Sequence, residues 1–237
     1  MTADLLAPLR EAPERSALIF DVDGTLAPIV ARPELAEVPR ATKAELERLA
    51  VRYLLVAFVS GRSGEEARRL VGLSGVRYVG NHGLELDPGV YELQAQLAAF
   101  RATVERKVED KGLTLTYHFR GAHEAEARAE LEEIARRAAA EGLAPRWGRK
   151  VLEIRPAVQA DKGTAVQVLI REAGARRALY AGDDTTDLDA FAALADTSLE
   201  HAVRVAVSSE EAPPGLAAAA DLVVEGTSGL AGILAQL

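Results

Sequence analysis

Short apolar runs alternate with segments of helical periodicity along most of the 237-residue chain. An apolar run of roughly four to eight residues predicts a strand buried on both faces, and apolar residues about three or four positions apart predict a helix with one buried face. On these criteria we expect core strands over residues 17–20, 54–59 and 178–181, and shorter or interrupted ones over 76–79, 203–207 and 222–224. Helices are expected over residues 41–52, 64–71, 162–173, 187–194 and 228–237. This alternation predicts an α/β fold with a doubly wound parallel sheet.

The pattern changes in the middle of the chain, over residues 84–156. The elements expected there are a hairpin over residues 84–91 around Asp87-Pro88-Gly89, a helix over 93–110, a strand over 113–119, a charged helix over 123–141 and a strand over 151–154. This mixture is typical of an α+β module. We therefore predict a core formed by residues 1–83 and 157–237, with an inserted cap domain at residues 84–156.

Composition and charge narrow the classes of function. Hydrophobic residues make up 49% of the chain and charged residues 27%, as in a soluble globular protein. The net charge of −8 opposes general binding to nucleic acid, which depends on neutralising phosphates. We see no apolar run long enough to span a bilayer and no apolar signal core near the N-terminus. With no cysteine there is no disulfide framework and no thiolate metal site. We expect a cytoplasmic monomer that does not bind membranes.

Four polar motifs either follow an expected strand directly or begin an expected helix. In chain order they are Asp21-Val22-Asp23-Gly24-Thr25-Leu26, Ser60-Gly61-Arg62, Lys162, and Gly182-Asp183-Asp184-Thr185-Thr186-Asp187. In an open parallel sheet the carboxyl ends of the strands border one crevice, so we expect these side chains to converge there.

The residue types in these motifs suit phosphate chemistry. Several carboxylates in one crevice need a cation, and oxygen ligands without cysteine favour Mg²⁺ over zinc. Carboxylates of Asp21 and Asp183 with the backbone carbonyl of Asp23 would suit that ion. One carboxylate can attack phosphorus, while a second protonates the leaving oxygen and then activates water. A lysine and a serine hydroxyl can hold the phosphate oxygens.

The four motifs, in this order, resemble those of the haloacid dehalogenase-like phosphatases. The resemblance implies that Asp21 is the nucleophile and Asp23 the general acid and base. The implied phosphate-binding residues are Thr25, Ser60, Gly61 and Lys162, with Lys162 also counted as catalytic. The implied Mg²⁺ site consists of Asp21, Asp23, Asp183, Asp184 and Asp187, the last two as ligands or as support for the ligands.

Further segments resemble the trehalose-6-phosphate phosphatases, one family of that superfamily. They are Gly80-Asn81-His82-Gly83, Thr116-Tyr117-His118-Phe119-Arg120 and the stretch 148–156 with its Glu153-Ile154-Arg155-Pro156. The resemblance covers almost the whole chain and implies Mg²⁺-dependent hydrolysis of trehalose 6-phosphate through an aspartyl-phosphate. The implied sugar-binding residues are His82, His118, Arg120, Arg149 and Glu153. The chain departs from the family in having Phe119 where a tyrosine is frequent, and Arg149 where a lysine is frequent.

Two alternatives stay open at this point. The substrate can be another sugar phosphate, such as sucrose phosphate or mannosyl-phosphoglycerate, because cap residues decide the sugar. The chain can also be a non-enzymatic phospho-aspartate switch domain, which likewise pairs acids with Mg²⁺ and a lysine. Asp23 and the inserted cap argue against the switch, since a long-lived acyl phosphate needs no neighbouring acid and base. Taken alone, His118 can be a core histidine and Glu153 a surface residue.

Overall fold

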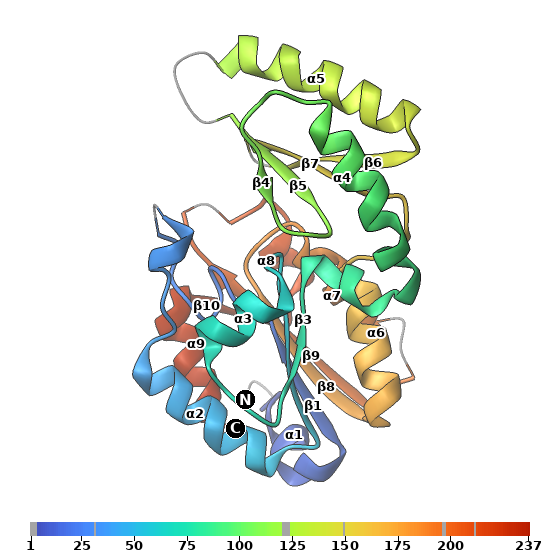
Figure 1. Cartoon of the computed structure of the whole chain (residues 1–237). Helices are drawn as coiled ribbons and strands as arrows, with labels where there is room; N and C mark the ends of the chain where they lie inside the picture. Colours follow the sequence, from blue (N-terminus) through green and yellow to red (C-terminus); the bar gives the residue numbers. More distant parts are fainter. Residues whose placement is uncertain (1–3, 31, 120–123, 149, 196–197, 211) are drawn as a thin grey trace. The chain divides into compact units, whose positions relative to one another are not determined.

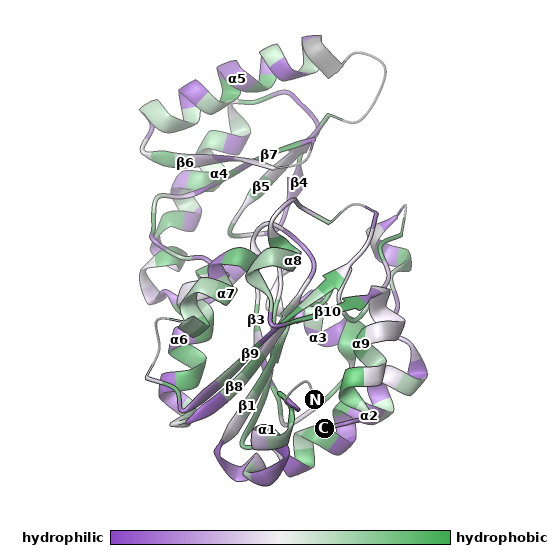
Figure 2. Cartoon of the chain, turned by 180° about the vertical axis from the view of Figure 1, so that it is seen from behind, coloured by the Kyte–Doolittle hydropathy of each residue, from purple (hydrophilic) through white to green (hydrophobic). Residues whose placement is uncertain are grey.

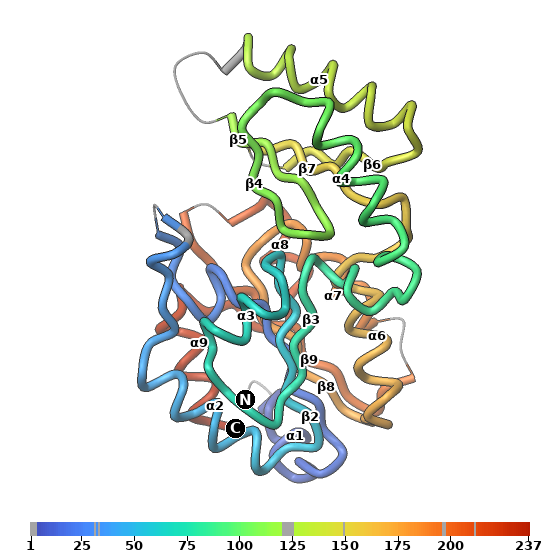
Figure 3. Tube along the Cα trace, in the orientation of Figure 1, coloured from blue at the N-terminus to red at the C-terminus, as the bar shows by residue number. Residues whose placement is uncertain are grey.

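The computed structural model describes residues 4–30, 32–119, 124–148, 150–195, 198–210 and 212–237. The chain divides into two units, residues 1–83 with 160–237, and residues 84–159. Figure 3 traces this path: the chain leaves the first unit after its teal segment, forms the green and yellow second unit, and returns in orange. The second unit is thus an insertion in the first.

The first unit is built on a six-stranded parallel sheet with the order β10-β9-β8-β1-β2-β3. Its strands are β1 (Ser16–Phe20), β2 (Leu55–Val59), β3 (Arg77–Val79), β8 (Arg177–Gly182), β9 (His201–Ser208) and β10 (Leu222–Glu225). All five residues of β1 are buried, as its continuous apolar run predicts. The strand order reverses between β1 and β8, and in doubly wound sheets the crevice that binds ligands opens at such a point.

Helices cover both faces of this sheet (Figure 1). On one face lie α2 (Arg40–Arg52) and α9 (Gly226–Leu234), and on the other α6 (Lys162–Ala173) and α7 (Asp187–Ala195). The helix α3 (Gly64–Val71) packs into the same apolar cluster as α2 and α9. Shorter helices are α1 (Ala7–Glu11), α8 (Leu216–Ala219), η1 (Pro13–Arg15) and η2 (Pro33–Leu35). Figure 2 shows hydrophobic and hydrophilic residues alternating around α2, as expected of a helix with one buried face.

The second unit contains an antiparallel sheet with the order β4-β5-β7-β6. Its strands are β4 (Glu109–Asp110), β5 (Leu115–His118), β6 (Leu143–Gly148) and β7 (Val151–Pro156). Its helices are α4 (Gln94–Ala102) and α5 (Glu124–Ala140), preceded by the 3₁₀ helices η3 (Asn81–Leu86) and η4 (Pro88–Leu93). One apolar cluster joins α4 and α5 to β5 and β7. The predicted fold class, a doubly wound α/β sheet with an inserted α+β domain, is confirmed.

The differences from the predicted elements lie mainly in the second unit. The hairpin predicted over residues 84–91 is wrong, because 3₁₀ helices occupy this segment. The Asp87 carboxylate accepts the N–H of Gly89 at 2.8 Å and so begins η4 instead of turning one strand into another. The helix predicted over residues 93–110 ends at Ala102, and the chain continues into β4. The strand β6 was not predicted, because Pro145 interrupts its apolar pattern.

Candidate active site

Asp21 stands directly beyond β1, at the point where the strand order reverses. Its backbone N–H donates to the carbonyl of Ala181 on β8 at 2.9 Å, which extends the β1–β8 ladder by one bond. Its side chain is 6% exposed, so a carboxylate is almost completely removed from water. A carboxylate in such a place needs a positive partner.

Lys162 is that partner, and a helix start positions it. Asp161 caps α6 by accepting the N–H of Thr164 at 2.7 Å, which makes Lys162 the first residue of the helix. The Lys162 Nζ lies 2.9 Å from Asp21 Oδ1 and 2.7 Å from Asp187 Oδ1, and its side chain is buried. Burial disfavours the charged lysine, but the carboxylates of Asp187 and Asp21 outweigh burial and raise the pKa of Lys162.

Asp187 accepts hydrogen bonds at both of its oxygens. Oδ1 accepts from Lys162 Nζ and from the Tyr180 hydroxyl, the latter at 2.6 Å. Oδ2 accepts the backbone N–H groups of Asp183 at 2.9 Å and Asp184 at 2.8 Å. The close approach depends on Gly182, because a Cβ there would lie 2.2 Å from the Asp187 Cγ. Asp187 therefore ties the acidic loop to Lys162.

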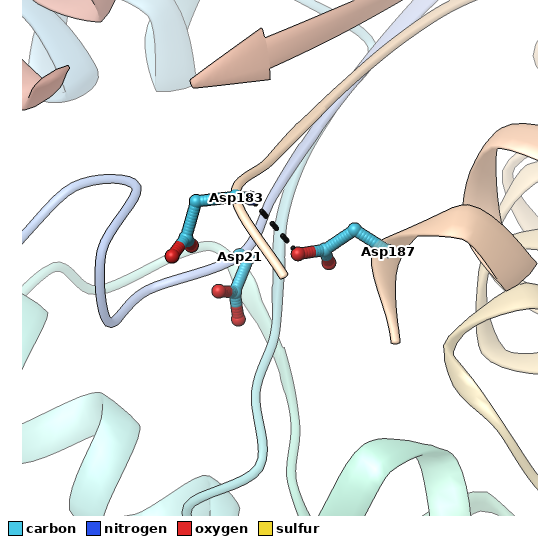
Figure 4. A group of neighbouring side chains, drawn as sticks. All are labelled: Asp21, Asp183 and Asp187. Carbon is cyan, nitrogen blue, oxygen red and sulfur yellow. Dashed lines mark hydrogen bonds between the residues drawn. The ribbon is translucent and has the colours of Figure 1, made fainter. Parts of the chain in front are cut away.

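The oxygens of Asp21, Asp183 and Asp187 lie within 4.8 Å of one another, and Figure 4 shows the three carboxylates gathered around one space. Three negative charges there face the single positive charge of Lys162, which leaves two in excess. Burial, with the charge of Asp187, raises the pKa of Asp183 to about 6. Burial also raises the pKa of Asp21 well above its ordinary value. A divalent cation would balance this excess, so the charge of the cluster fits a metal such as Mg²⁺.

Thr25 and Asp184, which were also predicted for the phosphate and metal sites, lie in different surroundings from each other. The Thr25 hydroxyl is buried and donates to Asp183 Oδ1 at 2.8 Å. This contact holds the Asp183 side chain against the loop after β1, where a Cβ on Gly24 would lie 2.0 Å from Asp183 Oδ2. Asp184 is exposed, and its Oδ1 accepts the N–H of Thr185 at 2.7 Å. Among the described residues, Asp184 lies outside the three-carboxylate cluster.

The segment after β2 brings Ser60, Gly61 and His82 together. Ser60 is buried, and its backbone N–H donates to the carbonyl of Val79 on β3 at 2.9 Å. The His82 N–H donates to the Ser60 carbonyl at 2.9 Å, and a Cβ on Gly61 would lie 2.7 Å from the His82 ring. His82 takes a left-handed backbone conformation with φ 53°, which is uncommon for a residue with a side chain. The His82 ring therefore packs against the Gly61 backbone.

Sequence reasoning missed two residues of this region. Tyr180, on β8, is fully buried and donates to Asp187. Arg62 forms a pair of hydrogen bonds with the Asp23 carboxylate, each at 2.7 Å. Tyr180 sits in a continuous apolar run that predicts only a buried strand. Arg62 directly follows Ser60-Gly61, so its position in that motif was the available signal.

The predicted sugar-binding residues of the second unit form a separate group. Glu153 on β7 pairs in register with Thr116 on β5 and Arg146 on β6, so the three share one face of the antiparallel sheet. His118 is exposed, and its Nε2 lies 2.8 Å from Glu109 Oε2. A buried core role for His118 is therefore excluded. Arg120 and Arg149 lie outside the described residues.

The chain is similar to proteins of one known family. The family model for trehalose-phosphatase matches residues 19–222. The chain belongs to the trehalose-phosphatase family. This confirms the resemblance inferred from the motifs.

Named relatives agree with the assignment. The chain is 35% identical over 216 residues to a trehalose-phosphate phosphatase of Mycobacterium marinum, covering 80% of this chain and 54% of that protein. It is 34% identical over 212 residues to a probable trehalose-phosphate phosphatase of rice, covering 76% of this chain and 56% of the rice protein. The chain thus spans little more than half the length of these relatives.

A solved structure supports the fold over nearly the whole chain. The trehalose-6-phosphate phosphatase of Aspergillus fumigatus is 27% identical, with a TM-score of 0.63. The similarity covers 99% of this chain and 96% of the fungal one. Within the described residues, no helix has the length and apolar character needed to span a membrane.

Proposed function

We propose that this chain hydrolyses trehalose 6-phosphate to trehalose and inorganic phosphate. The proposal rests mainly on the buried Asp21, which contacts Lys162 where the strand order of the sheet reverses. The chain that carries this pair belongs to the trehalose-phosphatase family. A buried carboxylate with an adjacent ammonium, beside two further carboxylates, suits attack on a phosphoryl group.

The reaction would take place in two steps. In the first, an Asp21 oxygen attacks phosphorus, the bond from phosphorus to the sugar oxygen breaks, and protonated Asp23 gives its proton to that oxygen. In the second, Asp23 removes a proton from water, the resulting hydroxide attacks phosphorus, and the bond to Asp21 breaks. The products are the sugar, inorganic phosphate and regenerated Asp21 and Asp23.

The residues around Asp21 would orient the phosphoryl group. Lys162 carries a fixed positive charge next to the nucleophile, and Ser60 is buried at the end of the neighbouring strand. With the Gly61 backbone, they would hold the phosphoryl oxygens, while Thr25, whose hydroxyl donates to Asp183, would hold that carboxylate in place. We assign the cation to Mg²⁺, held by Asp21, Asp183 and the backbone carbonyl of Asp23. When bound, it would neutralise the carboxylates and draw charge from the phosphoryl oxygens.

Asp187 and Asp184 would support this site from outside the ligand set. The four hydrogen bonds that Asp187 accepts occupy the lone pairs a metal would need. We therefore assign to Asp187 the task of holding Lys162 and the acidic loop. Asp184 contributes a backbone N–H to that arrangement.

The second unit would recognise the sugar as a cap domain. On its sheet, Glu153 has Thr116 on one side and Arg146 on the other, so an acceptor, a hydroxyl and a cation form one row. Such a row can exchange hydrogen bonds with several sugar hydroxyls. We add Thr116 and Arg146 to the sugar-binding residues predicted from sequence, which include His82, His118, Arg120, Arg149 and Glu153.

Phosphate release from a panel of substrates tests the proposal. The panel contains trehalose 6-phosphate, sucrose phosphate, mannosyl-phosphoglycerate, glucose 6-phosphate and an aryl phosphate, each with Mg²⁺ and with excess chelator. We expect the highest kcat/KM for trehalose 6-phosphate and no turnover in chelator. A preference for another sugar phosphate would reassign the substrate. Stable labelling by a phosphodonor, without release of phosphate from any substrate, would favour a switch domain.

A further inference from the structure

Arg62 holds the Asp23 carboxylate with two parallel hydrogen bonds. Its Nε donates to Oδ2 and its Nη2 donates to Oδ1, each at 2.7 Å. A paired contact of this kind fixes the plane of a carboxylate as well as its position. The two side chains are only 18% and 32% exposed, so water competes for them less than it does for a surface ion pair.

The backbone of Arg62 is fixed on both sides. Its N–H donates to Ser60 Oγ at 3.1 Å, and its carbonyl accepts the N–H of Asn81 at 2.8 Å. The next residue, Ser63, caps α3 through reciprocal hydrogen bonds with Glu66. Arg62 therefore lies between two constrained segments, and its fixed backbone limits where its guanidinium can lie.

The backbone around Asp23 is also constrained, but these bonds do not fix its side chain. The Gly24 N–H donates to the carbonyl of Ala27 at 2.7 Å, and the Leu26 N–H donates to that of Val22 at 2.9 Å. These bonds shape the loop after β1 and leave the side-chain torsions of Asp23 undetermined. The Arg62 contact selects one orientation of that carboxylate.

We propose that Arg62 is the positioning residue for Asp23. It sets the direction from which Asp23 meets the leaving sugar oxygen and the attacking water, and the two donors that Asp23 engages do not serve as phosphate ligands. This inference rests on the proposed function, since it requires phosphoryl transfer at Asp21. If Arg62 were instead a direct phosphate ligand, its removal would weaken the binding of inorganic phosphate as well as lower kcat.

A double-mutant cycle separates the two roles. We would measure kcat and KM for trehalose 6-phosphate with the parent, Arg62→Gln, Asp23→Asn and the double variant. Arg62→Gln should lower kcat by about 10²-fold, because a small displacement of a reacting group costs about that much. In the Asp23→Asn protein, the same change should alter kcat by less than about threefold, because the group to be positioned is absent. Arg62→Lys should restore part of kcat, since an ammonium can make one of the two bonds.

Binding of inorganic phosphate gives a readout that does not depend on turnover. Titration calorimetry with Mg²⁺ and phosphate should give the same Kd for the parent and Arg62→Gln if Arg62 acts only through Asp23. A direct ligand of the phosphoryl group would weaken binding by about tenfold or more when removed.

A matched control exists on β9. Arg204 makes the same paired contact with Asp221, at 2.9 and 2.7 Å, with side chains 32% and 26% exposed. Arg204→Gln should lower the Tm about as much as Arg62→Gln does and leave kcat unchanged.

Three results would overturn the inference alone: an unchanged kcat in Arg62→Gln, multiplicative losses in the double variant, or weakened phosphate binding. A parent protein that releases no phosphate from trehalose 6-phosphate would instead overturn the proposed function, and the inference with it.

Discussion

At the scale of single residues, hydrogen bonding divides the tasks of the acidic side chains. Asp187 accepts four donors and thereby connects Tyr180, Lys162 and the backbone of the acidic loop. Asp183 accepts the Thr25 hydroxyl, and its carboxylate shares a space with Asp21. Residues of one type, close in sequence, therefore differ in how many of their lone pairs remain for a ligand.

Removal of the Tyr180 hydroxyl tests this network. Tyr180→Phe keeps the ring, which packs edge-on against Phe191 at 6.1 Å between centroids, and removes one donor to Asp187. We expect kcat/KM for trehalose 6-phosphate to fall by about tenfold, since a hydrogen bond to a charged group contributes about 1.5–3 kcal/mol. Circular dichroism should show an intact fold.

Tyr117→Phe is the matched control for this change. Tyr117 is also buried, and within the described part of the chain its hydroxyl has no hydrogen-bond partner. Its removal should leave kcat/KM unchanged. Equal behaviour of the two variants would mean that the Tyr180 hydroxyl does not support the site.

At the scale of elements, the predicted strands and helices of the first unit agree with the structure because each has a simple physical signature. β1 and β2 are continuous apolar runs, and α6 has a cap residue at its start. The same patterns predicted where Asp21 and Lys162 lie. They could not predict the Tyr180 and Arg62 contacts, because those partners are distant in sequence or hidden in an apolar run. In the second unit, Asp87 supports a 3₁₀ helix or a turn equally well, and only the surrounding structure decides.

The strand β7 offers a test of sugar recognition at the element scale. Glu153→Ala removes a carboxylate from the polar face of the second sheet and leaves the residues around Asp21 unchanged. We expect kcat/KM for trehalose 6-phosphate to fall by about tenfold or more, because each hydroxyl left unpaired costs about 1–3 kcal/mol. An aryl phosphate, which offers no sugar hydroxyls, should be hydrolysed as by the parent.

Glu132→Ala on α5 serves as the control, because Glu132 is exposed and its contact with Arg128 is long, at 3.4 Å. Parallel losses for both substrates would show that Glu153 acts through folding. No loss for either would remove Glu153 from the sugar site.

At the scale of the whole molecule, the excess negative charge in the site links stability to protons and cations. The folded pKa of Asp183, about 6, lies above the value of about 3.9 for an unfolded aspartate. The folded state therefore binds this proton more tightly than the unfolded state. The protonation of Asp183 therefore stabilises the folded state fully below the unfolded pKa of Asp183, and this stabilisation is lost as the pH rises through its folded pKa.

Thermal unfolding checks this linkage. In excess chelator, the Tm should rise when the pH is lowered from about 7 to about 5. At about pH 7, added Mg²⁺ should also raise the Tm, and this rise should shrink below about pH 6 because the proton competes with the ion. Asp183→Asn should reduce both effects, and the part of the pH effect that remains is expected from Asp21, whose pKa burial also raises. A Tm in chelator that falls steadily from about pH 7 to about pH 5, with no response to Mg²⁺, would show that this cluster binds neither the proton nor the ion in the folded state.

Phosphate release from trehalose 6-phosphate by the parent and by Asp21→Asn, measured side by side with Mg²⁺, tests whether Asp21 is the nucleophile. The amide is nearly isosteric with the carboxylate but a poor nucleophile, so circular dichroism should show the same fold in both proteins. We expect turnover by the parent and a loss of more than about 10³-fold in the variant, which corresponds to about 4 kcal/mol in the barrier. Activity in the variant within about tenfold of the parent would contradict the assignment of Asp21 as the nucleophile.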